Sequence, residues 1–178
     1  MQYLASKIRG SWLVDSHSSD MPLIGLIERI ILDPGSLQVV LFGLGTGDKQ
    51  PVRHYIRADQ VIVDKTNGLI SASFESAGKA EDFIREQDTL RTHCELLHYK
   101  VVDGANKYVG RVHDYSLTVP LLRIEKLHIT TPIWRRLKDT HRIITRSQVI
   151  DVDCTKKLIR IKNSTATQRS RASQAIPA

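Results

Sequence analysis

IRADQVIVD at residues 56–64 returns at residues 144–153 as ITRSQVIDVD. The two stretches match at an offset of 88 through the shared QVI, and at an offset of 89 after one inserted residue. Each stretch then runs on to a Leu-Ile pair, Leu69-Ile70 in the first case and Leu158-Ile159 in the second. Self-similarity over tens of residues is the sequence signature of a structural unit that occurs more than once. We therefore expect the chain to fold as a repeat.

Two shorter matches precede this one, in the same order along the chain. Leu13-Val14-Asp15 aligns with Val101-Val102-Asp103, and Gly25 aligns with Gly110 after a deletion of three residues. Successive anchors in one order predict two copies of one small β domain with the same strand order, in which Gln60 and Gln148 are equivalent. The predicted domains are residues 1–77 and 92–162, separated by a linker helix at 78–91 and followed by a disordered tail at 163–178.

Strands, rather than helices, are predicted within both copies. Met21–Leu32 is apolar enough for a buried helix, but Pro22, Gly25 and its β-branched residues favour a strand. Asn67-Gly68 is the strongest signal for a two-residue hairpin turn in the chain. The apolar segments on either side of that turn should therefore pair antiparallel.

The segments outside the copies have a different character. Phe83, Ile84 and Leu90 lie on one face of a helical repeat whose other face is charged, which predicts the short linker helix. Residues 163–178 are mostly Ser, Thr, Ala, Gln and Arg, and Ile176 is the one large apolar residue among them. Such a composition does not bury enough apolar surface to fold, which predicts the disordered tail.

The net charge of +7 is distributed unevenly along the 178 residues. Residues 1–88 carry nine Lys and Arg against twelve Asp and Glu, a net charge of −3. The remaining residues carry seventeen against seven, a net charge of +10. Charge of one sign attracts partners of the other sign. The second copy is therefore expected to bind either RNA or an acidic protein surface.

Two further features bear on location and on the cysteines. No apolar run approaches the roughly 20 residues that a membrane helix needs, and residues 1–10 lack the apolar stretch of a signal peptide. We therefore expect a cytoplasmic location and no membrane span. Cys94 and Cys154 are too few for a disulfide framework, and each is expected to be a small buried hydrophobe rather than half of a bridge.

Each copy resembles the PRC-barrel family, which includes the cytoplasmic domain of the photosynthetic reaction-centre H subunit and the C-terminal barrel of a bacterial ribosome-maturation factor. The matching motifs are Val14-Asp15, Ile24-Gly25-Leu26-Ile27, Asp33-Pro34 and Arg57–Ile62 in the first copy, and Val102-Asp103, Val109-Gly110-Arg111-Val112 and Thr145–Ile150 in the second. The Asp-Pro turn has no counterpart in the second copy. The resemblance implies a mainly β chain with two small antiparallel six-stranded barrels in tandem. It also implies a protein that docks on larger assemblies without a catalytic residue.

Candidate chemical sites are weakly supported. Gly43-x-Gly45-x-Gly47 resembles a phosphate loop, but it lacks the Lys-Ser/Thr pair and the following helix that cradle phosphate. His93, Cys94, His98 and Cys154 would make a zinc site only if the copies brought them together, and their spacing matches no zinc motif. We therefore predict no catalytic residue, no metal site and no cofactor.

A basic loop in the second copy is the best candidate for partner binding. Its residues are Trp134, Arg135, Arg136 and Lys138, and Arg142 and Lys126 are expected to lie near them. Trp beside Arg is a frequent recognition element for bases or acidic surfaces, although Trp134 could instead pack on the barrel. Small barrels fill their interiors with side chains, which leaves binding to the outer surface. We expect a non-enzymatic scaffold or adaptor first, an RNA- or ribosome-associated assembly factor second, and an enzyme third.

Overall fold

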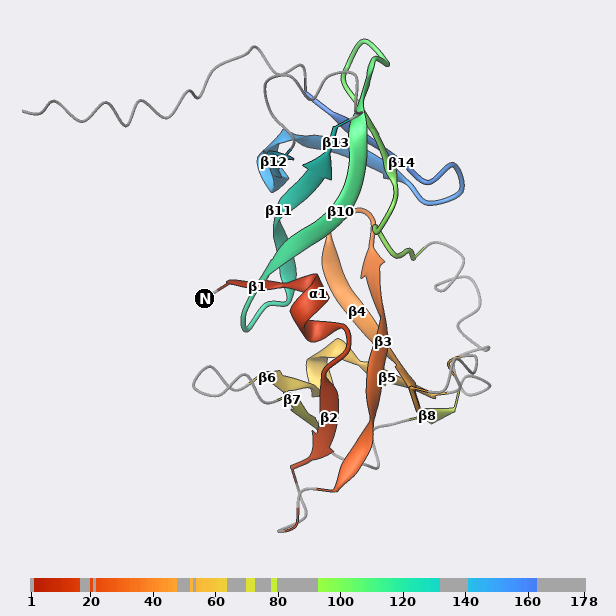
Figure 1. The fold of residues 1–178 in the computed structure, drawn as a ribbon, viewed down its shortest axis with the longest axis vertical. Coiled ribbons are helices and arrows are strands. Elements are labelled where there is room, and N and C mark those ends of the chain that lie inside the picture. The colour runs from red at the N-terminus through yellow and green to blue at the C-terminus, as the bar shows by residue number, and fades with distance from the viewer. Residues whose placement is uncertain are drawn as a thin grey trace, which may run out of the picture.

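The computed structural model describes residues 2–16, 20, 22–47, 52, 54–63, 70–72, 78–79, 93–131 and 141–162, and all structural statements concern these residues. The molecule is elongated, with the N-terminal strands towards one end and the C-terminal strands towards the other (Figure 1). All of its strands belong to one sheet. The prediction of a mainly β fold is therefore confirmed.

The strands form two units. The first unit contains β2 (Trp12–Asp15), β3 (Leu23–Asp33), β4 (Gln38–Gly45), β5 (His54–Arg57), a 3₁₀ helix (Ala58–Gln60), β6 (Ile62–Val63), β7 (Ile70–Ala72) and β8 (Gly78–Lys79). The second unit contains β9 (Lys100–Val102), β10 (Tyr108–Thr118), β11 (Arg123–Thr130), β12 (His141–Thr145), a 3₁₀ helix (Arg146–Gln148), β13 (Val149–Asp153) and β14 (Leu158–Ile161). Gln60 and Gln148 end the two 3₁₀ helices, so their predicted equivalence is confirmed.

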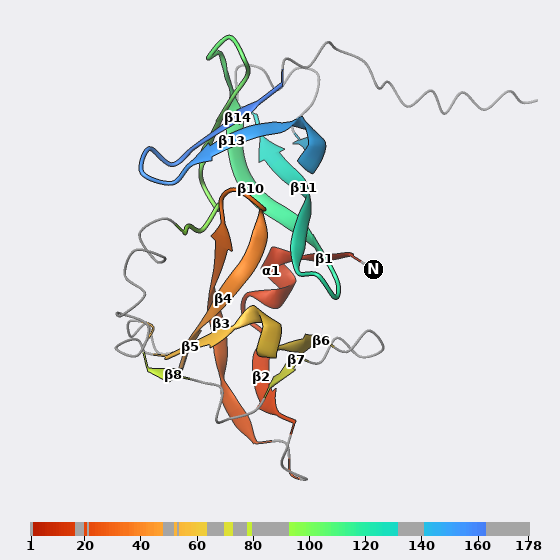
Figure 2. The same cartoon turned by 180° about the vertical axis from the view of Figure 1, so that it is seen from behind.

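Both units have the same strand order. It is β6-β7-β2-β3-β4-β5 in the first and β13-β14-β9-β10-β11-β12 in the second (Figure 2). The antiparallel pairing predicted for the segments on either side of Asn67-Gly68 is confirmed by β6 and β7, and the turn itself lies outside the described residues. The expectation of purely antiparallel units is wrong, because β7 pairs with β2, and β14 with β9, in parallel. β5 and β12 are each followed by a 3₁₀ helix rather than by a hairpin turn. The last strand of each unit, β7 or β14, therefore runs parallel to the first strand of that unit, β2 or β9.

The irregularities of the two units also coincide. A β-bulge places one extra residue in a strand and bends it. The register shifts leave an extra residue at Ile24, Glu28 and Val40 in the first unit and at the equivalent Val109, His113 and Glu125 in the second. The repeat detected in the sequence therefore extends to the details of backbone pairing.

The two units meet in a reciprocal contact between equivalent turns. The Val39 N–H donates to the Leu122 carbonyl at 2.8 Å, and the Ile124 N–H donates to the Leu37 carbonyl at 2.9 Å. Gln38 and Arg123, which are also equivalent, pair directly at the centre. Leu37 and Leu122 share an unusual positive φ, of 57° and 47°, and both are buried. Contacts exchanged between equivalent residues indicate an approximate two-fold relation between the units.

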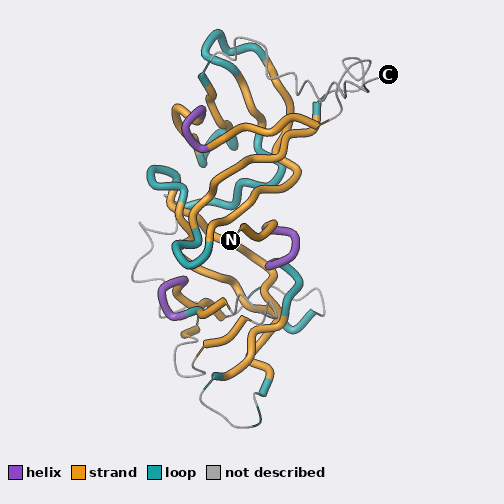
Figure 3. Tube along the Cα trace, turned by 90° about the vertical axis from the view of Figure 1, so that its left-hand side faces the viewer, coloured by secondary structure: helices purple, strands orange, loops and turns teal. Residues whose placement is uncertain are grey.

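Each unit also receives a segment that precedes the other. β1 (Gln2–Leu4) pairs with the end of β10, and α1 (Ala5–Ile8) follows between the units (Figures 1 and 3). On the other side, Cys94 pairs with Leu32 near the end of β3. Side-chain contacts also hold the two segments in place. Ser6 of α1 forms hydrogen bonds with Asp114 of β10, and Glu95, next to Cys94, forms an ion pair with Arg29 of β3.

One continuous core runs through both units. Leu13, Phe42 and Ile56 of the first unit, and Leu127 and Ile144 of the second, belong to the same fully buried cluster. The sheet curls as a half-barrel. Within the described residues, no ladder joins β5 to β6 or β12 to β13, so neither unit is closed by strand pairing. Closure into two complete barrels stays a prediction.

The predicted linker helix is wrong at its first two residues, because Gly78–Lys79 form β8 and pair with β5. Residues 80–92, which include Phe83, Ile84 and Leu90, lie outside the described residues, and so does the predicted tail at 163–178. Among the described helices, none has both the length and the apolar character needed to cross a membrane.

Candidate binding surfaces

Of the six residues predicted to bind a partner, the structure describes Lys126 in β11 and Arg142 in β12. Trp134, Arg135, Arg136 and Lys138 lie outside the described residues. Lys126 pairs with Thr145, whereas Arg142 pairs with Ile129, whose side chain is fully buried. Because successive side chains in a strand alternate between the two faces, Lys126 and Arg142 project to opposite sides of this ladder. These two residues therefore do not share one face of the ladder, and their predicted grouping around the loop at 134–138 stays a prediction.

Arg142 instead lines an open hollow of about 250 Å³ together with Asp103, Lys107, Tyr108, Val109 and Thr131. The carboxylate of Asp103 accepts hydrogen bonds from the backbone N–H groups of Ala105 at 3.0 Å and Lys107 at 2.9 Å. The Asp103 carboxylate thus binds backbone N–H groups of its own turn. Lys107 and Arg142 place two cations in the same hollow. Sequence reasoning missed Lys107, because it follows a turn with no motif of its own.

The outer faces of the two units differ at equivalent positions. Trp12 of β2 lies directly opposite Leu26 of β3, and at the same place in the second unit Lys100 of β9 lies opposite Arg111 of β10. Directly opposed side chains share one face of a sheet and contact each other. One unit therefore presents an apolar pair where the other presents two cations.

The apolar pair belongs to a larger exposed patch, the first-unit apolar face, defined by Trp12, Leu23, Leu26 and Ile62. Trp12, Leu23 and Ile62 are 46%, 61% and 62% exposed. Ile62 and Leu23 belong to one cross-strand row, through Ser71 and Val14, and Val14 is two residues from Trp12 on the same face. Ser71 is polar and Val14 is buried, so the exposed apolar side chains are close together on this face without being continuous. Groups of exposed apolar side chains mark interaction sites more often than single ones do.

The cationic pair belongs to the second-unit basic face, defined by Lys100, Arg111 and Arg160. Arg160 of β14 pairs with Val102, which is on the same face as Lys100. Arg160 lies 3.5 Å from the Asp151 carboxylate, and Arg111 donates to the carbonyl of His98 at 3.3 Å. Among the described carboxylates, none pairs with Lys100 or Arg111. Lys100 and Arg111 are therefore not neutralised by a carboxylate within the described chain.

A buried polar cluster lies under the N-terminal segment. The Asp114 carboxylate accepts from the Ser6 backbone N–H at 3.1 Å, from the Ser6 hydroxyl at 2.6 Å and from the Tyr115 N–H at 2.8 Å. Ser116 and His128 are joined at 2.8 Å between Oγ and Nε2. Burial raises the pKa of the neighbouring Tyr115 phenol. Ser116 is buried, so the pair lacks the open approach that a nucleophile and its base require. The hydrogen bonds between Ser6 and Asp114 anchor α1 to β10.

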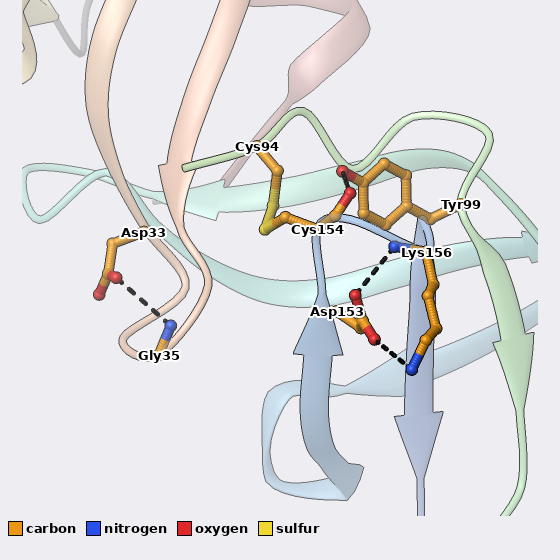
Figure 4. The surroundings of a disulfide bond; sticks show 7 residues. All are labelled: Asp33, Gly35, Cys94, Tyr99, Asp153, Cys154 and Lys156. Atoms are coloured by element: carbon orange, nitrogen blue, oxygen red, sulfur yellow. Dashed lines mark hydrogen bonds and ion pairs between the residues drawn. A yellow bond between two sulfur atoms is a disulfide. The ribbon is translucent and has the colours of Figure 1, made fainter. Parts of the chain in front are cut away.

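The expectation that both cysteines are unbridged is wrong, because Cys94 and Cys154 form a disulfide (Figure 4). Cys94 is held against β3 by its backbone hydrogen bonds with Leu32, and Cys154 lies in the turn between β13 and β14. Only the fold brings them together, since 60 residues separate them in sequence. The disulfide bond uses both sulfur atoms of the zinc site considered from the sequence, so they are not available as metal ligands while the bond is intact.

The surroundings of the disulfide are well hydrogen-bonded. The Tyr99 hydroxyl donates to the Cys154 carbonyl at 3.4 Å, and burial raises the pKa of that phenol. Asp153 accepts from the Lys156 backbone N–H at 2.8 Å and lies 3.3 Å from its Nζ (Figure 4). The hydrogen bond from the Lys156 backbone lowers the pKa of Asp153. These contacts fix the β13–β14 turn beside the end of β3.

Other kinds of site have no counterpart in the part of the chain that the structure describes. There, no group of three or more His, Cys, Asp or Glu side chains is placed to hold a metal ion. The two outer faces and the hollow at Arg142 are therefore the candidate sites. Comparison with known proteins adds nothing to this choice, because no protein-family model and no curated protein matches the chain.

Proposed function

We propose that this chain is a non-enzymatic scaffold or adaptor, built of two PRC-barrel-like units, that docks on a larger protein assembly through the outer faces of its units. The observation that carries the proposal is the pair of exposed Trp12 and half-buried Leu26, with exposed Leu23 and Ile62 on the same face. Tryptophan is among the residues that contribute most to protein interfaces. A packed barrel interior offers no substrate cavity, which leaves the outer faces for binding.

The charge of the first unit indicates what kind of partner fits. Residues 1–88, which comprise the first unit and the start of the segment after it, have a net charge of −3, so a partner surface with Lys and Arg around an apolar centre suits this part of the chain. Protein interfaces commonly combine an apolar centre with a polar rim. The proposed partner is therefore a protein with that arrangement.

The docking proposal predicts loss of binding without loss of folding. A photo-crosslinking amino acid at Trp12 identifies the partner in cells, and the purified partner is then titrated against W12T/L26T. We expect the variant to bind at least tenfold more weakly, while its free energy of unfolding falls by about 1 kcal/mol at most, the size of one cross-strand pair. I143T is the matched control, because Ile143 is also an exposed apolar strand residue but lies in the second unit.

Equal binding by W12T/L26T and the wild-type chain would remove the first-unit apolar face from the proposal. If the charge reversals R135E and R136E abolish binding instead, the predicted basic loop is the docking surface.

The second candidate function is an RNA- or ribosome-associated assembly factor that uses the basic second unit. The net charge of +10 beyond residue 88 and the unneutralised Lys100–Arg111 pair favour it. Nuclease treatment of a native extract separates the two candidates. Partners that disappear with nuclease support the RNA-associated function, and partners that persist support the scaffold.

A cytoplasmic location stays a prediction, and the disulfide supplies a test of it. Disulfides are rare in the cytoplasm, where glutathione and thioredoxin keep thiols reduced. In cells quenched rapidly with acid, we expect Cys94 and Cys154 to be free and to take up an alkylating reagent, measured as a mass increase. An intact bond under these conditions would instead place the chain in an oxidising compartment.

A further inference from the structure

We propose that the second-unit basic face binds the phosphodiester backbone of a nucleic acid, with Lys100 and Arg111 as the central contacts and Arg160 beside them. This inference rests on the second candidate function and gives it a surface, residues and a ligand chemistry. Phosphate oxygens are bound by Lys and Arg without regard to base sequence.

The strand register places these cations side by side. Lys100 and Arg111 are direct partners on antiparallel strands, which puts their Cβ atoms about 5 Å apart. Arg160 is one strand further along the same face, next to Val102. Lys157 lies in the turn that precedes β14, where its carbonyl accepts the Lys100 N–H at 3.0 Å. Three neighbouring strands thus contribute cations to a single outer face, and β13 adds one carboxylate, Asp151, which lies 3.5 Å from Arg160.

The fold itself does not require charge at these positions. Like charges directly opposite each other in a sheet are destabilising. The first unit has the same strand order and the same bulges, yet it holds Trp12 and Leu26 at the equivalent pair. The Lys100–Arg111 pair therefore lowers stability without a structural role in the described chain, and an anionic ligand would relieve the repulsion.

The small amount of exposed apolar surface around Lys100 and Arg111 favours a phosphate backbone over an acidic protein. A protein interface has an apolar centre. None of the large exposed apolar side chains among the described residues lies in β9, β10 or β14, and Leu158, which pairs with Lys100, is half-buried. The nearest large exposed one is Ile150 of β13, next to Asp151, the partner of Arg160. A face of cations without an apolar centre instead suits a ligand whose negative charge repeats along a chain.

The full chain can be tested directly by fluorescence anisotropy with a labelled oligouridine and, in a separate arm, a labelled oligothymidine. Removing both central cations in K100T/R111T should weaken binding at least tenfold. It should also reduce the slope of log K against log salt by about 2, since each phosphate contact contributes about one. Thr is a good strand former and ends the repulsion, so the thermal midpoint should stay the same or rise.

The matched control is K7A/R57A, which removes two exposed cations from outside this face. It should change the affinity by less than threefold. A comparison of the RNA and DNA arms shows which nucleic acid the face prefers.

Three outcomes would overturn the proposal. Undetectable binding of both oligonucleotides at low salt removes nucleic acid as the ligand. Full binding by K100T/R111T places the nucleic-acid contact elsewhere and leaves the RNA-associated function standing. Tighter binding of a poly-glutamate peptide of equal charge, lost in the same variant, makes the ligand an acidic protein. Nuclease-resistant partners in extract would count against the RNA-associated function itself, whatever this face binds in isolation.

Discussion

G110A is expected to lower the free energy of unfolding by about 3 kcal/mol, the upper end of the usual cost of overpacking a well-packed site. A Cβ at Gly110 would lie 2.6 Å from Ile129 Cγ2 and would overlap the Thr130 carbonyl oxygen. The carbonyl belongs to the β10–β11 ladder, so the overlap is relieved only by moving the backbone of a paired strand. Urea denaturation measures the loss as a lower midpoint at an unchanged slope.

The first unit supplies the matched control for this substitution. Gly25 is the equivalent residue, but a Cβ there would meet Leu44 Cβ at 3.3 Å and the Gly45 carbonyl oxygen at 3.4 Å, contacts that a backbone shift of a few tenths of an ångström relieves. Alanine also restricts the unfolded chain and stabilises by up to about 1 kcal/mol where it fits. G25A should therefore change the stability by less than about 1 kcal/mol in either direction. Similar losses in G25A and G110A would show that close packing on the neighbouring strand does not explain the need for Gly110.

Loss of the disulfide should have an effect of similar or greater size. The bond joins residues that are 60 apart in sequence, and closing a loop of that length in the unfolded chain stabilises by about 4 kcal/mol in the chain-entropy description. C94A/C154A should therefore unfold at markedly lower denaturant concentration than the oxidised wild-type chain.

A reductant distinguishes the bond from the side chains. Dithiothreitol should bring the wild-type chain close to C94A/C154A and should leave the variant unchanged. If the reduced and oxidised wild-type chains unfold at the same midpoint, the bridge contributes nothing to stability.

The repeat made much of the fold predictable. Two copies of one pattern imply one strand order, and the equivalence of Gln60 and Gln148 followed from it. The pairing of β1 with β10 could not be predicted, because residues 2–4 carry no pattern that names a strand more than 100 residues away. The disulfide depends on the same long-range contacts, since Cys94 reaches Cys154 only when it pairs with Leu32.

The candidate sites were less predictable, because residues close in sequence or in charge can lie on opposite faces of a strand pair, as in β11 and β12. Clustering of charge along the sequence suggested that Lys126 and Arg142 act together, but strand alternation sends them to opposite faces. The second-unit basic face could have been predicted from the repeat by comparing the side chains at equivalent positions of the two copies. Aligning the copies position by position sets Trp12 against Lys100 and Leu26 against Arg111. That comparison shows where equivalent surfaces have opposite chemistry.

The reciprocal hydrogen bonds between Leu37 and Ile124, and between Leu122 and Val39, have the geometry of a symmetric homodimer written into one polypeptide. In a true homodimer each substitution occurs twice, so an apolar face on one subunit is an apolar face on both. Covalent joining of the copies removes that constraint while keeping the shared core. Trp12 and Lys100 can then differ, and one molecule holds two unlike faces in a fixed relation. The two proposed docking surfaces would in this way bring an apolar partner and an anionic one together.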